Sequence, residues 1–425
     1  MSFFATSDAK PEWVNGLPDD WTSDWLKWSA TLSTERPNDE EKELLPYISN
    51  EHIESWTGKL MIGNAEPSES DGRKFSTDDV LFNKLRPYLA KVYQAEFDGV
   101  SSGELLCLRP SNRLDSRFLF HVVSSKLFVD AVNLETFGSK MPRADWEIVG
   151  HQPLPLPPIN IQKQIAAFLD EKTAQIDGLI EKKRALLDRL AEKRQALITK
   201  AVTKGLDPNV PIKDSGIDWL GHVPEHWEVL PIRRLTKAVG TGRTPPSDSG
   251  DYFSEREVEW YTPGDFVGRL ELGTSKRYIT QQAIDDKVAN LYPPNTLMLV
   301  GIGATLGKVS VTKVAASANQ QINAIQFLPQ HTPYFFANAL TAFRDEVRMT
   351  SNGNTLGILN QDGTKSLVLP VPPANEQIEI VTLLRGAEKN DLSIRGRISD
   401  SIVLLEEYRA ALISSAVTGK IEGLQ

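Results

Sequence analysis

The chain has 425 residues, enough for two or three domains, and its 40% hydrophobic and 24% charged residues are typical of a globular protein. No apolar run approaches the roughly 18 residues that span a bilayer, and the N-terminus does not resemble a signal peptide, so we expect a cytoplasmic protein. The net charge of -9 gives no support to DNA binding, because neutralising phosphates needs Lys and Arg. A single cysteine and six scattered histidines exclude a disulfide framework and a zinc-binding spacing.

Residues 1–156 are predicted to form a first globule of mixed α/β structure. Runs of β-forming residues at 79–82 and 103–108 indicate strands, and the Gly-, Pro- and Asn-rich segments between such runs indicate turns. A helix is expected at about residues 116–128. Cys107 lies in the second run, where a buried thiol is a better interpretation than a nucleophile because no histidine lies nearby in the sequence.

Residues 157–212 are predicted to contain a long helix. Asn160 follows a proline cluster and is a candidate N-cap, and no further proline precedes Gly205, where the helix is expected to end. Apolar residues recur at two heptad positions, which predicts a narrow apolar stripe that needs a partner helix.

Residues 213–371 are predicted to form a second mixed α/β globule. Runs at 295–300 and 322–327 indicate strands, and a helix is expected at about 333–349. Residues 372–425 are predicted to contain a second long helix, which begins after Asn375 and ends at Gly419.

An internal duplication organises these four segments. Residues 155–205 align without a gap with residues 370–420, and 16 of the 51 positions are identical. A weaker match relates Trp13 and Trp21 to Trp219 and Trp227. A period above 200 residues indicates duplicated domains, because solenoid repeats have periods of about 20 to 50 residues. We therefore expect an α+β protein with two related globules and a pair of antiparallel coiled-coil helices. The alternative is two unrelated amphipathic helices, each packed on its own globule.

Several motifs in this order resemble one known family. Residues 213–227 (KDSGIDWLGHVPEHW), the proline-rich entry to each long helix and the ALIxxAVT exit are similar to the specificity subunit of type I restriction–modification systems. The loops at 84–89 (KLRPYL), 138–143 (GSKMPR) and 303–309 (GATLGKV) are similar to loops of that family. The resemblance spans nearly the whole chain, although the opening of the first globule departs from the pattern and leaves its start open.

The resemblance implies a subunit that recognises DNA and has no cofactor of its own. Each globule is expected to read one half of a split, asymmetric double-stranded DNA target, with the helices as an antiparallel spacer. Two modification subunits, which bind S-adenosylmethionine and methylate adenine, are the expected partners, and a translocating nuclease subunit is a further one.

The expected DNA contacts are polar and basic side chains on loops, because bases are read by Arg, Lys, Asn and Gln while phosphate contacts set the register. For each residue alone, an ordinary solvated loop side chain is an equally good interpretation. As a set, the candidates cluster on turns between strands. In the first globule the candidates are Arg73, Lys74, Lys84, Arg86, Lys91, Ser139, Lys140 and Arg143, and in the second they are Thr241, Arg243, Thr244, Lys308, Asn319, Gln320, Gln321, Asn352 and Asn354.

Basic residues on the first long helix have two interpretations. They bind carboxylates of a partner subunit, or they simply face water. The candidates for partner binding are Lys182, Lys183, Arg184, Arg189 and Arg194.

No motif indicates catalysis by this chain. The segment 301–308 resembles a P-loop, but Ile302 stands where glycine is needed and Val309 where Ser or Thr must bind magnesium. Neither a methyltransferase motif nor the flanking order of a metal nuclease is present. Two other functions remain open, a coiled-coil scaffold whose two globules bind proteins and a stand-alone DNA enzyme.

Overall fold

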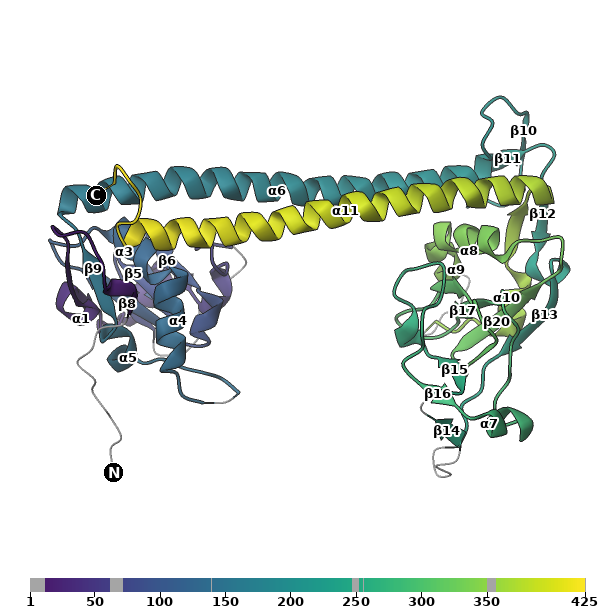
Figure 1. Cartoon of the computed structure of the whole chain (residues 1–425), viewed down its shortest axis with the longest axis horizontal. Coiled ribbons are helices and arrows are strands. Elements are labelled where there is room, and N and C mark those ends of the chain that lie inside the picture. Colours follow the sequence, from purple (N-terminus) through teal and green to yellow (C-terminus); the bar gives the residue numbers. More distant parts are fainter. Residues whose placement is uncertain are drawn as a thin grey trace. The chain divides into compact units, whose positions relative to one another are not determined.

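A computed structural model describes residues 12–61, 72–138, 140–246, 252–254, 256–349 and 357–424. The chain divides into two compact units, one with the residues up to Arg184 together with those from Ile398 onward, and one with Ala185–Arg397. Each unit consists of a globule that packs against segments of two long helices (Figure 1). Across these described residues, no helix is long and apolar enough to cross a bilayer.

The globule of the first unit contains three small sheets. Its main sheet is antiparallel in the order β2-β8-β5-β6, with a second sheet β3-β7-β4 and a pair β1-β9. The helices are α1 (Leu26–Ser29), α2 (Asp39–Leu44), α3 (Ser116–Val123), α4 (Lys126–Leu134) and α5 (Trp146–Gly150). The strands are β1 (Thr22–Trp25), β2 (Ala30–Leu32), β3 (Tyr47–Ile48), β4 (Arg73–Phe75), β5 (Val80–Asn83), β6 (Val92–Gln94), β7 (Gly99–Ser101), β8 (Leu105–Pro110) and β9 (Pro153–Leu156).

The globule of the second unit has a main sheet β13-β20-β17-β18, a second sheet β14-β16-β15-β19 and the pairs β12-β21 and β10-β11. Its helices are α7 (Gln281–Asp285), α8 (Pro333–Ala342), α9 (Arg344–Met349) and α10 (Gln361–Ser366). The strands are β10 (Ile212–Asp214), β11 (His222–Pro224), β12 (Glu228–Pro231), β13 (Thr236–Thr241), β14 (Phe253–Ser254), β15 (Val258–Tyr261), β16 (Tyr278–Ile279), β17 (Leu297–Val300), β18 (Val309–Val311), β19 (Ala316–Ala318), β20 (Ile322–Phe327) and β21 (Val368–Val371).

The duplication seen in the helices extends through both globules. Val80 pairs with Leu108 in the first main sheet and Leu297 pairs with Ile325 in the second, so the two registers match at a constant offset of 217 residues. The strand pairs β1-β9 and β12-β21 also correspond in register, with offsets of 206 residues for the first strand and 215 for the second. A slip of one residue would turn every side chain of a strand to the opposite face of the sheet. The strand register is therefore retained in both copies even where their amino acids differ. The expected internal repeat is confirmed.

Two long helices complete the units, α6 (Ile159–Lys204) and α11 (Ala374–Val417). Each ends at a glycine in the left-handed region, Gly205 (φ 70°) and Gly419 (φ 69°), as the sequence predicts. A Cβ on Gly205 would lie 3.3 Å from Trp227, so the close approach of the globule also requires glycine. The predicted N-cap role of Asn160 and Asn375 is wrong, because both helices begin one residue earlier.

The two helices predicted inside the globules are each divided. α3 ends at Val123, and α4 begins at Lys126 after Ser125, whose side chain accepts a hydrogen bond from the Phe128 amide and so caps a new helix. In the second unit α8 ends at Phe343 and α9 follows. The expectation of one continuous helix at 116–128 and at 333–349 is therefore corrected; in the first case the Ser125 cap overrides the apolar periodicity.

The long helices pair antiparallel within each unit, as expected. In the first unit Asp177 of α6 forms an ion pair of 2.9 Å with Arg409 of α11. In the second unit Arg194 of α6 forms an ion pair of 2.6 Å with Glu388 of α11. Arg194 and Arg409 occupy the same position of the repeat, so each copy uses one arginine to bind the other helix.

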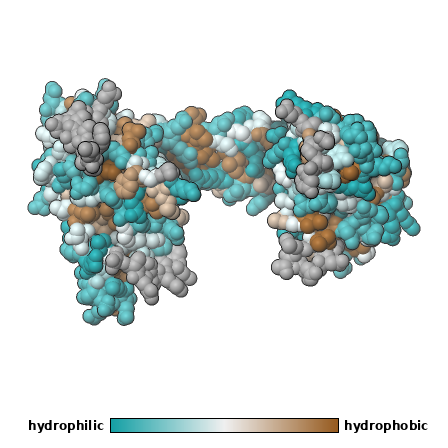
Figure 2. Space-filling model, turned by 90° about the horizontal axis from the view of Figure 1, so that it is seen from below, coloured by the Kyte–Doolittle hydropathy of each residue, from teal (hydrophilic) through white to brown (hydrophobic). Residues whose placement is uncertain are grey.

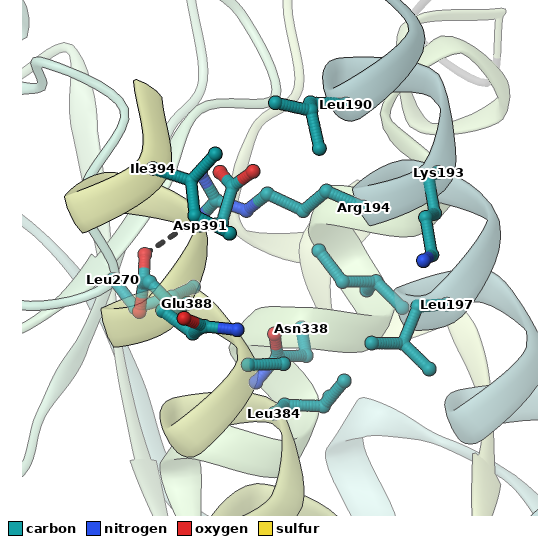
Figure 3. Close-up of a pocket in the computed structure, with 13 residues that line it drawn as sticks. Leu190, Lys193, Arg194, Leu197, Leu270, Asn338, Leu384, Glu388, Asp391 and Ile394 are labelled. Atoms are coloured by element: carbon teal, nitrogen blue, oxygen red, sulfur yellow. Dashed lines mark hydrogen bonds and ion pairs between the residues drawn. The ribbon is translucent and has the colours of Figure 1, made fainter. Parts of the chain in front are cut away.

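The helix pair of the second unit is not fully packed. A pocket of about 270 Å³ lies between α6 and α11. The Arg194–Glu388 ion pair lies at its wall (Figure 3). The side chains of Leu197 and Leu384 line it from the two helices, and Asn338 of α8 contributes a polar group.

A buried glutamine joins each globule to its long helix. In the first unit Gln162 of α6 accepts a hydrogen bond from the Asp115 amide (2.7 Å) and donates to the carbonyls of Arg113 and Pro157. In the second unit Gln377 of α11 accepts from the Thr332 amide (3.0 Å) and donates to a proline carbonyl in the same way. Both side chains are 1% exposed, so each amide satisfies backbone groups that water cannot reach.

We expect Gln162→Leu to lower the free energy of unfolding of the first unit by about 2 to 4 kcal/mol, because it leaves three backbone groups without partners. Denaturant unfolding of the full chain measures this loss. The matched control is Gln164→Leu, which changes an exposed residue two positions further and should alter stability by less than about 0.5 kcal/mol. Equal effects of the two variants would contradict the assigned role.

His121 makes the first unit sensitive to acid. Its buried ring bonds through Nε2 to Asp170 of α6 (2.8 Å), and Arg117 binds the same carboxylate. Burial lowers the pKa of His121, since it penalises the charged ring more than the hydrogen bond to Asp170 favours it. Below pH 6.5 the unfolded chain therefore takes up a proton that the folded chain does not, and stability falls as the pH decreases.

We expect His121→Asn, which copies Asn338 at the equivalent position, to remove this pH dependence below pH 6.5. In the unaltered chain, the contribution of His121 makes the free energy of unfolding fall by up to about 1.4 kcal/mol for each pH unit below 6.5, until the pKa of the folded state is reached. Denaturant unfolding of both variants between pH 5 and pH 8 measures this pH dependence. His222→Asn, at an exposed position, serves as the control, and an unchanged slope in His121→Asn would refute the assignment.

Candidate nucleic-acid interface

In each unit, loops gather at one end of the main sheet. β8 and β20 lead into α3 and α8, whose first turns are joined to the long helices by Gln162 and Gln377. The opposite ends of these strands therefore point away from the long helix. At that end lie the first loop cluster (residues 84–86, 102–104 and 140–143) and the second loop cluster (residues 241–244, 301–303, 319–321 and 358–361).

The two loop clusters are held together by equivalent backbone bonds. The Lys84 amide donates to the Glu104 carbonyl (3.0 Å), and the Gly301 amide donates to the Gln321 carbonyl (2.8 Å). The Lys84 carbonyl accepts from the Ala144 amide, as the Gly301 carbonyl accepts from the Leu359 amide. The same scaffold thus presents different side chains in the two units.

Arg86 adopts a backbone conformation that is unfavourable for its residue type. Its φ is 53°, and the equivalent position of the second unit is Gly303 with φ 87°. A side chain in the left-handed region costs about 1 kcal/mol or more, so an arginine at this position is consistent with the predicted role in recognition. Its Nε is buried with no hydrogen-bond partner among the residues described. Arg86 is therefore the strongest predicted contact in the first loop cluster.

The other predicted residues of the first globule differ in whether their side chains already have a hydrogen-bond or ion-pair partner. Arg143 binds both carboxylate oxygens of Glu104 (2.6 and 2.8 Å), which compensates its charge. The Lys84 ammonium has no partner in the described ranges, and Lys140 is exposed. Arg73 begins β4 beside this cluster, and its buried Nη1 likewise has no partner there. Ser139 lies outside the described residues.

Three predicted lysines are used within the fold. Lys91 donates to the Asn50 carbonyl (2.7 Å) and Lys308, at the equivalent position, donates to the Phe266 carbonyl (2.9 Å). Lys74 forms an ion pair with Glu41, and this hydrogen bond raises the pKa of Lys74. These contacts give each lysine a structural role, and their binding of DNA stays a prediction.

In the second loop cluster, amides and hydroxyls bond to one another. Asn319 donates to the Gln321 side chain (3.0 Å), and Thr244 bonds to Gln320. The Arg243 guanidinium donates to the Lys287 carbonyl (3.0 Å), while Thr241 donates to Asn323 (2.8 Å). The predicted residues Asn352 and Asn354 lie outside the described residues.

Sequence reasoning missed four residues of these clusters. They are Glu104, Asn323, Asn360 and Gln361, which join the clusters through strand register and the turn before α10. An offset of 217 residues relates Glu104 to Gln321, but that offset differs from both offsets found in the sequence and becomes visible only through the strand pairing.

The predicted partner-binding residues on α6 fall into two groups. Arg184 and Arg194 form ion pairs with Glu406 and Glu388 of α11. Lys182, Lys183 and Arg189 have no ion-pair partner in the portion of the chain that the structure describes.

A family model described as the type I restriction modification DNA specificity domain matches residues 29–189 and 224–402, which together cover most of both units. The chain belongs to this family. It is a DNA-recognition subunit of the type I restriction–modification class.

Similar proteins agree with this assignment. The chain is 26% identical over 168 residues to the specificity subunit of the type I restriction enzyme EcoDI of Escherichia coli, which covers 38% of this chain and 36% of that protein. A putative specificity subunit, MjaX of Methanocaldococcus jannaschii, is 23% identical over 99% of this chain and 98% of its own length.

Two solved structures support the fold. One comes from a study of complex assembly and conformational transition of the type I R-M system, with a TM-score of 0.79 and 18% identity over 95% of this chain and 99% of that chain. The HsdS subunit of Thermoanaerobacter tengcongensis has a TM-score of 0.55 and 19% identity over 95% of this chain and 98% of that chain.

We expect Glu104→Gln to strengthen DNA binding by this specificity subunit, because it removes the carboxylate that compensates Arg143. Log affinity against log salt should then become steeper by about one unit, as expected for one additional phosphate contact. Binding titrations of the assembled complex at several salt concentrations measure the slope. Glu43→Gln, at an exposed position on α2, is the control, and an unchanged slope in Glu104→Gln would place Arg143 outside the interface.

Proposed function

We propose that this specificity subunit reads a bipartite, asymmetric DNA target, one half with each globule. The supporting observation is the pair of loop clusters, which share one backbone scaffold but differ in chemistry. Glu104 and Arg143 of the first cluster correspond to Gln321 and Ile358 of the second, and Arg86 corresponds to Gly303. A common scaffold with different side chains is suited to two half-sites of different sequence.

We further propose that catalysis belongs to partner subunits. Two modification subunits would bind S-adenosylmethionine and methylate adenine, and a translocating nuclease subunit would cleave DNA. The surfaces of the long-helix segments suit such partners, because large apolar side chains stand exposed there (Figure 2). Those with the largest exposed fractions include Leu392 (54%), Val403 (52%) and Leu404 (64%). Exposed apolar residues of this size are typical of docking surfaces.

The proposal predicts that the purified chain alone transfers no methyl group and that adding its modification subunits creates site-specific adenine methylation. Sequencing that detects methylated adenine identifies the target. Lys84→Ala or Arg86→Ala should weaken or change recognition of one half-site only, and Arg243→Ala should affect the other half. Lys163→Ala, at an exposed position on α6, is the control for target choice. Methylation by the isolated chain, or a simultaneous change of both half-sites, would refute the proposal.

A further inference from the structure

The second loop cluster contains a cleft lined mainly by amides and apolar side chains, with one carboxylate, Asp362, which pairs with Lys365 (3.5 Å). It has a volume of about 410 Å³, and its walls come from the end of β13, the loop after β17, the start of β20 and residues 358–362. No lysine or arginine lines this cleft in the part of the unit that the structure describes. A site without cations is poorly suited to phosphate, but amides are the groups that read base edges.

Asn323 lines the cleft and has no free hydrogen-bond donor left for a ligand. Its buried amide donates to the Leu359 carbonyl (2.8 Å) and the Thr364 hydroxyl (2.9 Å), and its oxygen accepts from Thr241. This residue fixes the walls relative to one another. The hydrogen-bond donors that read a base must therefore come from the other amides.

The remaining amides offer a defined set of free groups. Gln320 and Gln321 each use the side-chain oxygen within the cluster, in bonds to Thr244 and Asn319, and each keeps a free NH₂ donor. Asn360 uses its oxygen to cap α10 through the Gly363 amide. Gln361 differs from all of these, because neither its oxygen nor its nitrogen has a partner among the described residues. Both of its polar atoms are therefore available to a base edge, and it can donate and accept without sharing an atom with a bond inside the cluster.

Two apolar side chains complete the cleft. Ile302 and Ile358 are joined by a β-bridge at its rim, and Ile358 is 51% exposed. An exposed isoleucine beside amide donors is chemically complementary to thymine, which presents a methyl group and the O4 acceptor in the major groove. A bidentate amide is complementary to N6 and N7 of adenine. Together these groups match an A·T base pair.

We propose that this amide cleft reads an A·T base pair in the half-site bound by the second unit. Gln361 accepts from adenine N6 and donates to adenine N7, Gln320 or Gln321 donates to thymine O4, and the two isoleucines contact the thymine methyl group. The inference rests on the proposed function and names the base pair that this site takes. The first unit does not share it, because Glu104 and Arg143 stand at the positions equivalent to Gln321 and Ile358.

The test measures DNA binding and methylation by the complex of this chain with its modification subunits. Each position of the second half-site is replaced in turn by all four base pairs. Gln361→Ala should reduce discrimination by about 5- to 150-fold at one A·T position only. Gln361→Glu, which can only accept, should shift the preference at that position toward cytosine, whose N4 donates. A merely structural role of Gln361 would not produce such a directed shift.

A modified base provides an independent measurement. Replacing the adenine at that position by 7-deazaadenine removes the N7 acceptor, so it should weaken binding of the unaltered complex but have no further effect in Gln361→Ala. Gln282→Ala, at an exposed position on α7, is the control. If the complex recognises its target but Gln361→Ala changes no position of the half-site, the amide-cleft proposal is overturned while the proposed function stands. If the unaltered complex shows no sequence-specific binding, both are overturned.

Discussion

Each globule depends on two helix segments that are far apart in the sequence. Leu169 of α6 and Val417 of α11 are both buried in the core of the first unit, and Leu384 of α11 and Val202 of α6 are both buried in the core of the second. A helix with a narrow apolar stripe gains little stability alone in water, so its ends must be buried by a globule. The globules in turn need these helices to cover their apolar faces. This mutual burial is the constraint on which the arrangement of loops in each unit depends.

The same constraint explains how one scaffold tolerates two surfaces. Strand register and the buried glutamines Gln162 and Gln377 keep the backbone arrangement the same in both units. Among the described residues, the loops at the far end of each sheet are not part of the contacts between globule and helices. The charged Glu104 and Arg143 and the neutral Gln321 and Ile358 then occupy equivalent positions. Loops held by a rigid sheet can diverge in chemistry without loss of stability, which is why recognition residues concentrate there.

The negative net charge does not contradict a DNA-recognition subunit. Much of the positive charge is paired within the fold, as Lys74 is with Glu41 and Arg194 is with Glu388. We predict that recognition uses the few basic groups without a partner among the described residues, such as Lys84. Overall charge governs long-range steering, whereas base readout depends on short hydrogen bonds at defined positions.

The sequence alone determined the two long helices, their glycine ends, the main strands of both globules and the family, because apolar periodicity, glycine and proline act locally and leave direct marks. It did not determine the division of the short helices at Ser125 and Phe343, the internal use of Lys91 and Lys308, or the grouping of Gln361 with Gln320. Those features arise from strand register and from contacts between segments many residues apart. A side chain on a loop acquires its role from the neighbours that folding brings to it, and only the tertiary structure decided which neighbours these are.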